Sequence, residues 1–503
     1  MRSNDNLSRI FIALFFVVFI LLRFWNLTGS CLWFDELFSV HAAEQSWRNI
    51  FSFVAQDLIH PPLFYVLLKL WISVGGENLY FLRIFPALFA IVSLIPFSYL
   101  CRQLKFEFPS FVLALAFFTF NGALIKYSQE VRMYSLLLCL SLFSIWLFVR
   151  FLDLGKNIWI LTIINFLLVY THYFGWLVVI TEILAILYFQ RIKIRQILTM
   201  FGIVLAAYIP WILMIFRSAN INADLGQNIG WIERPNLFVL VKSVLNFLEP
   251  FYFQQSNVEP ISNFLFSIPL LIVLFTGIAF YFAGWKDQSE TDKRNFLFLL
   301  IFTKIPAWIV FIASWILPFS FWGTRHLIIL FAPTAILLSL MLNKVELKPL
   351  KYLIFSVLAI IFAGAFLFQI QRPKPQFIWC AWEKLAENID KDQARKIYVF
   401  EDLVAYHFWF AFRDTDKILV VRVKDVPEMI EDKAYFLPRG FDQVETADAN
   451  VFNENRFYVA FRDMKWNEFH PPLNILKEKG YKIGTPKEID VNGLKAFLVE
   501  VSK

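Results

Sequence analysis

The sequence predicts a polytopic α-helical membrane protein that carries a soluble α/β domain at its C-terminal end. Two observations predict this fold class. The chain of 503 residues is 58% hydrophobic and 19% aromatic, whereas soluble domains are about 45–50% apolar. Long apolar runs fill the chain up to residue 370, and charged and apolar residues mix after it. We therefore expect a membrane domain over residues 1–370 and an α/β domain over residues 371–503.

Apolar runs of near-spanning length define the membrane domain. A helix needs about 20 apolar residues to cross a bilayer, and eleven runs approach that length. They cover residues 9–24, 84–101, 108–125, 133–150, 157–171, 173–190, 197–216, 263–284, 295–317, 326–343 and 352–370. The first run is expected to be an uncleaved span, because Arg23, Phe24 and Trp25 follow it where a signal peptide would have small residues.

Basic loops set the predicted orientation. Residues 63–74 end at two glycines and are too short to cross, so they are treated as a non-spanning segment. With a cytoplasmic N-terminus, the Lys- and Arg-containing loops then lie inside, as the positive-inside rule requires; they are residues 102–105, 191–195, 286–294 and 344–351. The net charge of +7 is explained by such loops and does not call for a nucleic-acid partner. The first loop, residues 25–83, and the C-terminal domain are predicted to lie outside the cell membrane.

Both outer regions have predicted structure. In the first loop, helical spacing of apolar residues predicts an amphipathic helix in the membrane surface; these residues are Trp47, Ile50, Phe51, Val54 and Leu58. After a Pro-containing linker at 372–375, alternating patterns predict strands at 396–400, 418–423, 456–461 and 494–501, and helices at 382–389 and 473–478. The four cysteines show no disulfide framework, and Cys101 and Cys139 are expected to be packing residues.

Ionisable residues concentrate on the predicted outer side. They are Asp35, Glu36, His41, His60, Glu130, Arg132, His172, Arg325 and His326. Because charge is costly in lipid, such a group predicts a site that faces outward. Each member also has a structural explanation. The acid pair and His172 can cap helices or turns, His60 can be a turn residue, Glu130 can pair with Arg132, and Arg325 with His326 can snorkel to the interface.

Three successive motifs in about the first 135 residues resemble those of family 39 and related C-type glycosyltransferases. The motifs are Trp33-Phe-Asp-Glu36, His60-Pro-Pro-Leu-Phe-Tyr65 followed by Arg83-Ile-Phe-Pro-Ala-Leu-Phe89, and Tyr127-Ser-Gln-Glu-Val-Arg-Met-Tyr134. The group includes protein O-mannosyltransferases and bacterial aminoarabinose transferases. The resemblance implies the C-type fold, a polyprenyl-phosphate sugar donor, transfer on the outer face and inversion at the anomeric carbon. It makes Asp35 the general base and Glu130 the acid of the second outer loop. Ile59 stands where some relatives carry Glu.

The chemistry of the residues agrees with that reading. A hydroxyl that attacks a sugar carbon needs a carboxylate to take its proton, and a departing lipid phosphate needs cations or a metal ion. The predicted catalytic residues are Asp35, Glu36 and Glu130. The predicted substrate-binding residues are His60, Arg132, Tyr134, His172, Arg325 and His326. A divalent metal ion is a candidate cofactor, with Glu130 and His172 as its ligands.

The predicted function is transfer of a sugar to a lipid, glycan or protein hydroxyl by a protein of a bacterial inner or plasma membrane. The alternative is a transporter or flippase of lipid-linked sugars. A transporter would place ionisable groups near the middle of several spans, and Lys304 and Glu182 are the main ones found there. A scaffold whose tail binds a partner is a third reading, which no motif supports.

Overall fold

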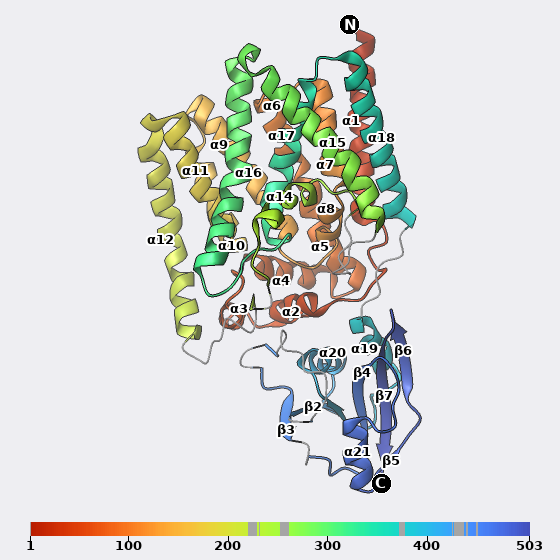
Figure 1. Ribbon diagram of the computed structural model, residues 1–503. Coiled ribbons are helices and arrows are strands. Elements are labelled where there is room, and N and C mark those ends of the chain that lie inside the picture. The colour runs from red at the N-terminus through yellow and green to blue at the C-terminus, as the bar shows by residue number, and fades with distance from the viewer. Residues whose placement is uncertain are drawn as a thin grey trace. The chain divides into compact units, whose positions relative to one another are not determined.

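Two units make up the chain in the computed structural model (Figure 1). The structure describes residues 2–219, 229–230, 232–251, 261–371, 378–424, 426, 437–438, 441–448 and 451–503. The membrane unit holds the described residues of Met1–Leu27, Ile59–Asn220 and Ile232–Pro373. The C-terminal unit holds those of Thr28–Leu58 and Lys374–Lys503. The predicted linker at 372–375 lies outside the described residues, as do residues 220–228, 231 and 252–260.

The membrane unit is helical wherever a span was predicted. Its helices are α1 (Arg2–Phe24), α4 (Leu63–Gly75), α5 (Leu79–Val92), α6 (Leu94–Gln103), α7 (Phe108–Phe120), α8 (Gly122–Tyr127), α9 (Tyr134–Leu154), α10 (Ile158–Thr171), α11 (Gly175–Phe189), α12 (Ile194–Ala219), α14 (Leu237–Asn246), α15 (Ile261–Ala283), α16 (Glu290–Ile316), α17 (Phe331–Asn343) and α18 (Lys348–Gln371). Short 3₁₀ turns are η1 (Arg191–Lys193), η2 (Trp285–Asp287) and η3 (His326–Leu330).

Length separates the helices that can cross a bilayer from shorter ones. Among the described residues, six segments are long and apolar enough to cross, and they are Leu79–Gln103, Tyr134–Leu154, Arg191–Ser218, Glu290–Ile316, His326–Asn343 and Lys348–Gln371. The α4 helix has 13 residues, or about 20 Å at 1.5 Å per residue, against a hydrocarbon core of about 30 Å. The α7 helix is equally short, so the total of eleven spans remains a prediction.

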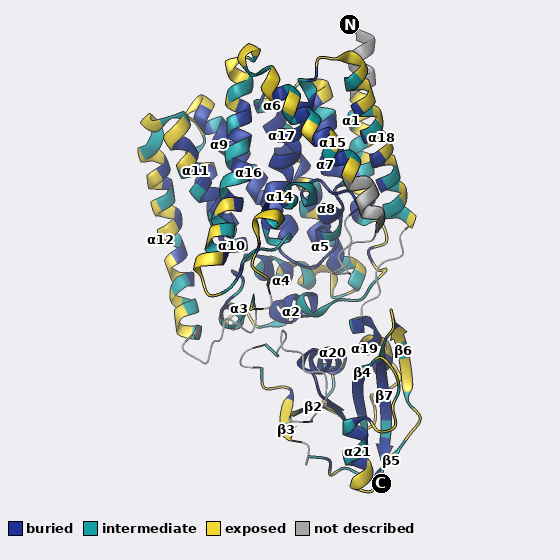
Figure 2. Cartoon of the chain, in the orientation of Figure 1, coloured by how far each residue is buried: buried dark blue, intermediate teal, exposed yellow. Residues whose placement is uncertain are grey.

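Burial distinguishes central from peripheral helices. The α9 and α17 helices are mostly buried inside the membrane unit, whereas most residues of α12 and α18 are exposed or partly exposed (Figure 2). An exposed apolar surface suits lipid contact. Near the end of α1, Arg23 is buried and donates to the carbonyl oxygens of Thr119 (2.6 Å) and Phe118 (3.0 Å). Its charge thereby complements the C-terminal end of α7 and ties the two helices together.

A mixed sheet forms the core of the C-terminal unit. Its strands are β1 (Arg395–Val399), β2 (Ile418–Lys424), β3 (Glu445–Asp448), β4 (Arg456–Asp463), β5 (Lys482–Ile483), β6 (Lys487–Val491) and β7 (Leu494–Ser502), in the order β3-β2-β1-β4-β7-β5, with β6 on β7. The first four in that order are parallel, and β7 is antiparallel to β4. Alternation along β1 sends Ile397 and Val399 into one apolar cluster and Tyr398 into the other.

Helices cover both faces of this sheet. The α19 (Ile378–Ala386) and α20 (Asp402–Phe412) helices pack on one face, and α21 (Pro471–Glu478) packs on the other. The four predicted strands and both predicted helices are present, although α19 begins earlier than predicted. The sequence patterns did not predict α20, β3, β5 and β6. A signal for the β6–β7 hairpin was available, since Asn492 and Gly493 both have positive φ there and Asn-Gly favours such turns.

Residues 28–58 of the predicted first outer loop belong to the C-terminal unit, whereas residues 59–83 belong to the membrane unit. In residues 28–58, the α2 (Phe34–Glu44) and α3 (Ile50–Asp57) helices include Leu37, which joins the apolar cluster of α19 and α20. His41 lies with its Nδ1 2.9 Å from the Tyr406 hydroxyl, and Glu44 pairs with Arg413 at 2.8 Å. Burial, together with the smaller effect of the nearby Arg413, lowers the pKa of His41 to about 4. His41 is thus a neutral packing residue.

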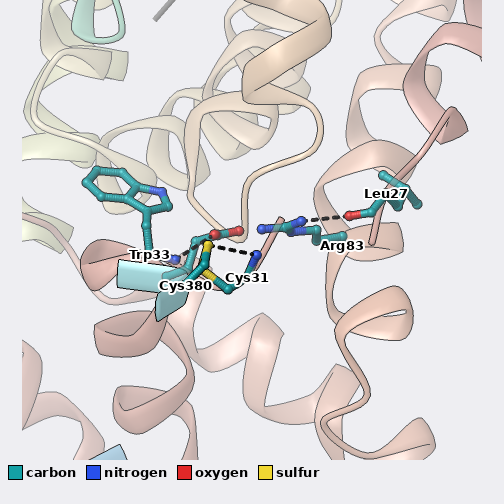
Figure 3. Close-up of a disulfide and its surroundings, with 6 residues drawn as sticks. Leu27, Cys31, Trp33, Arg83 and Cys380 are labelled. Carbon is teal, nitrogen blue, oxygen red and sulfur yellow. Dashed lines mark hydrogen bonds between the residues drawn. A yellow bond between two sulfur atoms is a disulfide. The ribbon is translucent and has the colours of Figure 1, made fainter. Parts of the chain in front are cut away.

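The predicted amphipathic helix corresponds to the short α3, which buries Ile50 and Val54 in protein and exposes Phe51. Its place in a membrane surface stays a prediction. The expectation that the cysteines form no disulfide was wrong. A disulfide joins Cys31 to Cys380 (Figure 3). Local sequence patterns could not indicate this bond, because 349 residues separate the two cysteines. Cys101 and Cys139 are free and buried, as expected of packing residues.

The cysteine pairing predicts a simple labelling result. Alkylation of the denatured protein without reductant should modify Cys101 and Cys139, because only free thiols react. Reduction before alkylation should add Cys31 and Cys380. Peptide mass spectrometry identifies the labelled residues, and Cys31→Ser serves as the control that should free Cys380. Labelling of all four cysteines without reductant would contradict the pairing.

Candidate functional site

The predicted site residues fall in both units. His60, Glu130, Arg132, Tyr134, His172, Arg325 and His326 belong to the membrane unit, and Asp35 and Glu36 belong to the C-terminal unit. Within the membrane unit, four of these residues come together in a group that we call the cationic cluster, which consists of His60, Arg132, His172 and His326.

Each member of the cationic cluster stands at or just before the start of a helix. His60 precedes α4, Arg132 precedes α9, His172 precedes α11, and His326 opens the η3 turn that leads into α17. A helix N-terminus carries a partial positive charge and unpaired N–H groups, and it attracts anions. The local sequence therefore places four cationic or imidazole side chains at four positive helix ends.

The side chains of the cluster are within contact distance of one another. Arg132 Nη2 lies 3.3 Å from His60 Nε2 and 3.5 Å from His60 Nδ1. The rings of His60 and His172 are 5.4 Å apart, and those of His172 and His326 are 5.8 Å apart. His60, Arg132 and His172 are buried, and His326 is partly buried. The Tyr134 ring lies 6.2 Å from that of His172, so this predicted residue borders the cluster.

The turn between α10 and α11 fixes His172. Its Nδ1 accepts a hydrogen bond of 3.0 Å from the Phe174 N–H, which confirms the capping role and puts the proton of the neutral ring on Nε2. That buried Nε2 has no partner within the part of the chain that the structure describes. A Cβ on Gly175 would lie 2.6 Å from the Leu168 carbonyl oxygen, so the close turn requires glycine here.

The electrostatics of the cluster favour an anion. Burial lowers the pKa of His60 and His172, and the neighbouring positive groups, among them Arg132 and Arg325, lower both further. Both imidazoles are therefore neutral at pH 7 beside a buried guanidinium. An anion with several acceptor oxygens would neutralise Arg132 and accept from the Nε2–H of His172, which phosphate does well.

Glu130 has a defined partner in the structure. Its carboxylate pairs with Lys126 at 3.1 Å, and the Arg132 N–H donates to its backbone oxygen at 2.6 Å. The sequence reading did not single out Lys126, although a Lys and a Glu four residues apart on a helical turn are a recognisable pair. Lys126 lies in α8, and its side chain is largely buried.

The described residues do not fit the metal site predicted from Glu130 and His172. Among them, no group of three or more His, Cys, Asp or Glu side chains could hold a metal ion. The physical reason is the local charge, because Arg132 contacts His60 and Lys126 contacts Glu130. A divalent cation would be placed beside two cationic side chains, whereas an anion is attracted by them.

The acid pair opens α2 in the C-terminal unit. Glu36 is fully buried, and its Oε2 accepts from the Trp33 N–H at 3.1 Å. This is the reciprocal half of a capping box, so the capping explanation accounts for one oxygen of Glu36. Asp35 is one residue earlier and partly exposed. The two adjacent carboxylates therefore have different surroundings.

Two further residues, Gln129 and Arg83, hold the site motifs in place and were not predicted to be site residues. Gln129 Nε2 donates to the carbonyl oxygens of Leu22 (3.0 Å) and Trp25 (3.0 Å), which holds the third motif against the end of α1. Arg83 donates to the Leu27 carbonyl oxygen at 2.6 Å (Figure 3). Both residues lie inside motifs that were recognised, so their presence there was the available signal.

The buried histidines predict acid sensitivity. In the unfolded chain His60 and His172 titrate near pH 6.5, whereas burial keeps their pKa values lower in the folded protein. Below about pH 6.5 the unfolded state therefore binds more protons, and stability falls with falling pH. Thermal melting in detergent should show a lower midpoint at pH 5.5 than at pH 7.5. The double variant His60→Gln, His172→Gln should flatten this dependence, and an unchanged slope would contradict the assignment.

Comparison with solved structures identifies the fold. No protein-family model matches this sequence, and no curated protein is similar to it in sequence. The structure of ArnT from Cupriavidus metallidurans in the apo state is similar with a TM-score of 0.60 and 10% identity, over 99% of this chain and 98% of that chain. The same protein bound to undecaprenyl phosphate is similar with a TM-score of 0.57 and 10% identity, over 98% of both chains. The chain therefore has the fold of the C-type glycosyltransferases, with the C-terminal α/β domain included in the match.

Proposed function

We propose that the protein is a membrane glycosyltransferase that moves a sugar from a polyprenyl-phosphate donor to a hydroxyl group on the outer face of the membrane. The observation that supports this function best is the cationic cluster. A buried arginine, three histidines, the starts of three α-helices and the η3 turn would suit an anion in a unit made largely of apolar helices. A lipid phosphate has the charge for the cluster and the hydrocarbon tail for the helices around it. The similar ArnT structure was determined with undecaprenyl phosphate bound.

The reaction assigns different tasks to the two groups of residues. The carboxylate of Asp35 takes the proton of the acceptor hydroxyl, whose oxygen forms a bond to the anomeric carbon. The bond between that carbon and the phosphate oxygen breaks, and the phosphate keeps the electron pair. Arg132 stabilises the growing charge, with His60, His172, Arg325 and His326 as neighbouring donors or charges. Attack opposite the leaving phosphate inverts the anomeric carbon.

The cluster needs no metal ion for this stabilisation. Arg132 carries a permanent charge, and the neutral imidazoles gain protons more readily once an anion is bound. Glu130 then has the role of holding Lys126 and the Arg132 turn rather than ligating a metal. Tyr134 borders the same cluster and is proposed to line the donor site.

Two observations support the outward orientation. The disulfide between Cys31 and Cys380 belongs to an oxidising compartment, such as a bacterial periplasm or an exterior surface. The basic loops at 191–195 and 286–294 favour the cytoplasm. The acceptor is proposed to be a hydroxyl of an envelope lipid, glycan or protein. No observation on the described residues favours a transporter of lipid-linked sugars over the transferase.

Removal of the guanidinium should weaken donor binding. Arg132→Ala should reduce the affinity for undecaprenyl phosphate by about 10- to 100-fold, because a hydrogen bond to a charged group contributes about 1.5–3 kcal/mol. Arg132→Lys should lose less, since it keeps a charge. Binding is measured with the purified protein in nanodiscs, and Arg195→Ala removes an exposed cation of the same unit as a control. Equal affinity of Arg132→Ala and wild type would contradict the phosphate site.

Neutral substitutions of similar shape should distinguish the roles of Asp35 and Glu36. Asp35→Asn removes the proposed base, so transfer from a radiolabelled polyprenyl-phosphate sugar to mixed envelope acceptors should fall by about 10² or more. Glu36→Gln keeps an oxygen for the Trp33 N–H, and Gln also serves in capping boxes. Its turnover should stay within a few-fold of wild type. Full activity of Asp35→Asn would rule out the base, and a loss in Glu36→Gln comparable to that expected for Asp35→Asn would give Glu36 the catalytic role.

A further inference from the structure

A second buried polar group lies among the spans, away from the helix ends that carry the cationic cluster. It joins Ser144 of α9, Asn165 of α10 and Glu182 of α11. All three residues are completely buried. Ser144 Oγ lies 2.7 Å from Glu182 Oε1 and 2.6 Å from Asn165 Oδ1, and Asn165 Nδ2 lies 2.7 Å from Glu182 Oε2. We call these three residues the polar clasp.

The amide of Asn165 has a definite orientation. Its Nδ2 faces both Glu182 Oε2 and the sulfur of Met200 on α12, at 3.4 Å. A thioether sulfur accepts hydrogen bonds and cannot donate them. The two amide hydrogens therefore serve Glu182 and Met200, and Oδ1 faces Ser144.

Counting protons then shows that one is missing if Glu182 is charged. The clasp contains two oxygen–oxygen contacts, Ser144 with Asn165 and Ser144 with Glu182, and each needs one hydrogen. Ser144 has a single hydroxyl hydrogen, and Asn165 Oδ1 can only accept. Ser144 must therefore donate to Asn165, and the hydrogen of the other contact must come from Glu182. Reversing the amide leaves the same deficit, because Oδ1 would then face Glu182 Oε2.

We propose that Glu182 is a protonated carboxylic acid and that the polar clasp is an uncharged lock between three helices. Its Oε1–H donates to Ser144, Ser144 donates to Asn165, and Asn165 donates back to Oε2. Every strong donor and acceptor that faces the ring is then used. The proton also removes a charge that would be costly at this depth in an apolar helix bundle.

The location of the clasp gives it a positioning role, which rests on the proposed function. Asn165 lies about two turns before the end of α10, and Glu182 lies about two turns after the start of α11. The turn between them carries His172. Ser144 lies on α9, whose first residue follows Arg132 closely. The clasp therefore fixes the hairpin of His172 against the helix that begins beside Arg132.

Infrared spectroscopy tests the proton directly. The difference spectrum between wild type and Glu182→Gln, in detergent at pH 7, should contain the C=O stretching band of a protonated carboxylic acid that the variant lacks. Carboxylate bands in that difference, with no protonated C=O band, would overturn the proposal. This measurement does not depend on any transferase activity.

Substitutions test the lock independently. Glu182→Gln offers an amide hydrogen to Ser144 and an oxygen to Asn165, so it should melt at the wild-type temperature and keep the wild-type KM for the donor. Glu182→Ala leaves buried Ser144 and Asn165 without that partner, so it should melt at a lower temperature and raise KM. Thr181→Val is the matched control, because the Thr181 hydroxyl bonds only within its own helix in the described structure.

The outcomes separate the inference from the proposed function. Melting of Glu182→Gln as low as that of Glu182→Ala would overturn the uncharged lock. If Glu182→Ala does not fold, the spectrum and the melting of Glu182→Gln still decide the protonation state. Wild-type KM in a folded Glu182→Ala with lowered stability would overturn the positioning role alone. Absence of transfer in the wild type would count against the proposed function and leave the spectroscopic result standing.

Discussion

Compensation of buried charge is the constraint on which the membrane unit depends. Its helices provide an apolar surrounding in which an isolated charge or unpaired polar group is expensive. Arg23 meets this constraint with the carbonyl oxygens at the end of α7, and Glu130 meets it with Lys126. In the polar clasp, the proposed proton on Glu182 removes the charge. The cationic cluster is different, because its helix ends favour negative charge and the Nε2 of His172 lacks a partner among the described residues. We propose that an anionic ligand accepts a hydrogen bond from that Nε2.

The same physics explains why histidines suit this cluster. A cluster of lysines or arginines at four helix N-termini would repel itself strongly in the absence of ligand. Imidazoles can stay neutral when the site is empty, as the lowered pKa values of His60 and His172 indicate. They can take up protons when a phosphate arrives. One permanent charge on Arg132 attracts the anion, and the histidines adjust to it without a large cost to the folded state.

The C-terminal unit contains a segment from the N-terminal part of the chain as well as the α/β domain. It includes the α2 helix with Asp35 and Glu36, and Leu37 of that helix is part of the unit's apolar core. The disulfide between Cys31 and Cys380, the ion pair of Glu44 with Arg413 and the contact of His41 with Tyr406 fasten this segment. The proposed base is therefore carried by the C-terminal unit, and substitutions in α20 can act on it through packing.

The sequence by itself determined those features that depend on neighbouring residues. Apolar runs predicted most helical segments of the membrane unit, because lipid demands continuous apolar helices, but they did not predict α14. Alternation predicted the main strands, and motif spacing picked out residues that the structure brings together, such as His60 with Arg132.

Tertiary structure alone decided the rest. The attachment of residues 28–58 to the C-terminal unit, the disulfide across 349 residues and the pairing of Glu130 with Lys126 each depend on which groups meet in the fold. The polar clasp also depends on the tertiary structure. A single acid in an apolar run does not indicate that a serine and an asparagine from other helices will form hydrogen bonds with it. Local patterns indicate whether a segment lies in lipid or in water, whereas tertiary packing determines which distant residues it contacts.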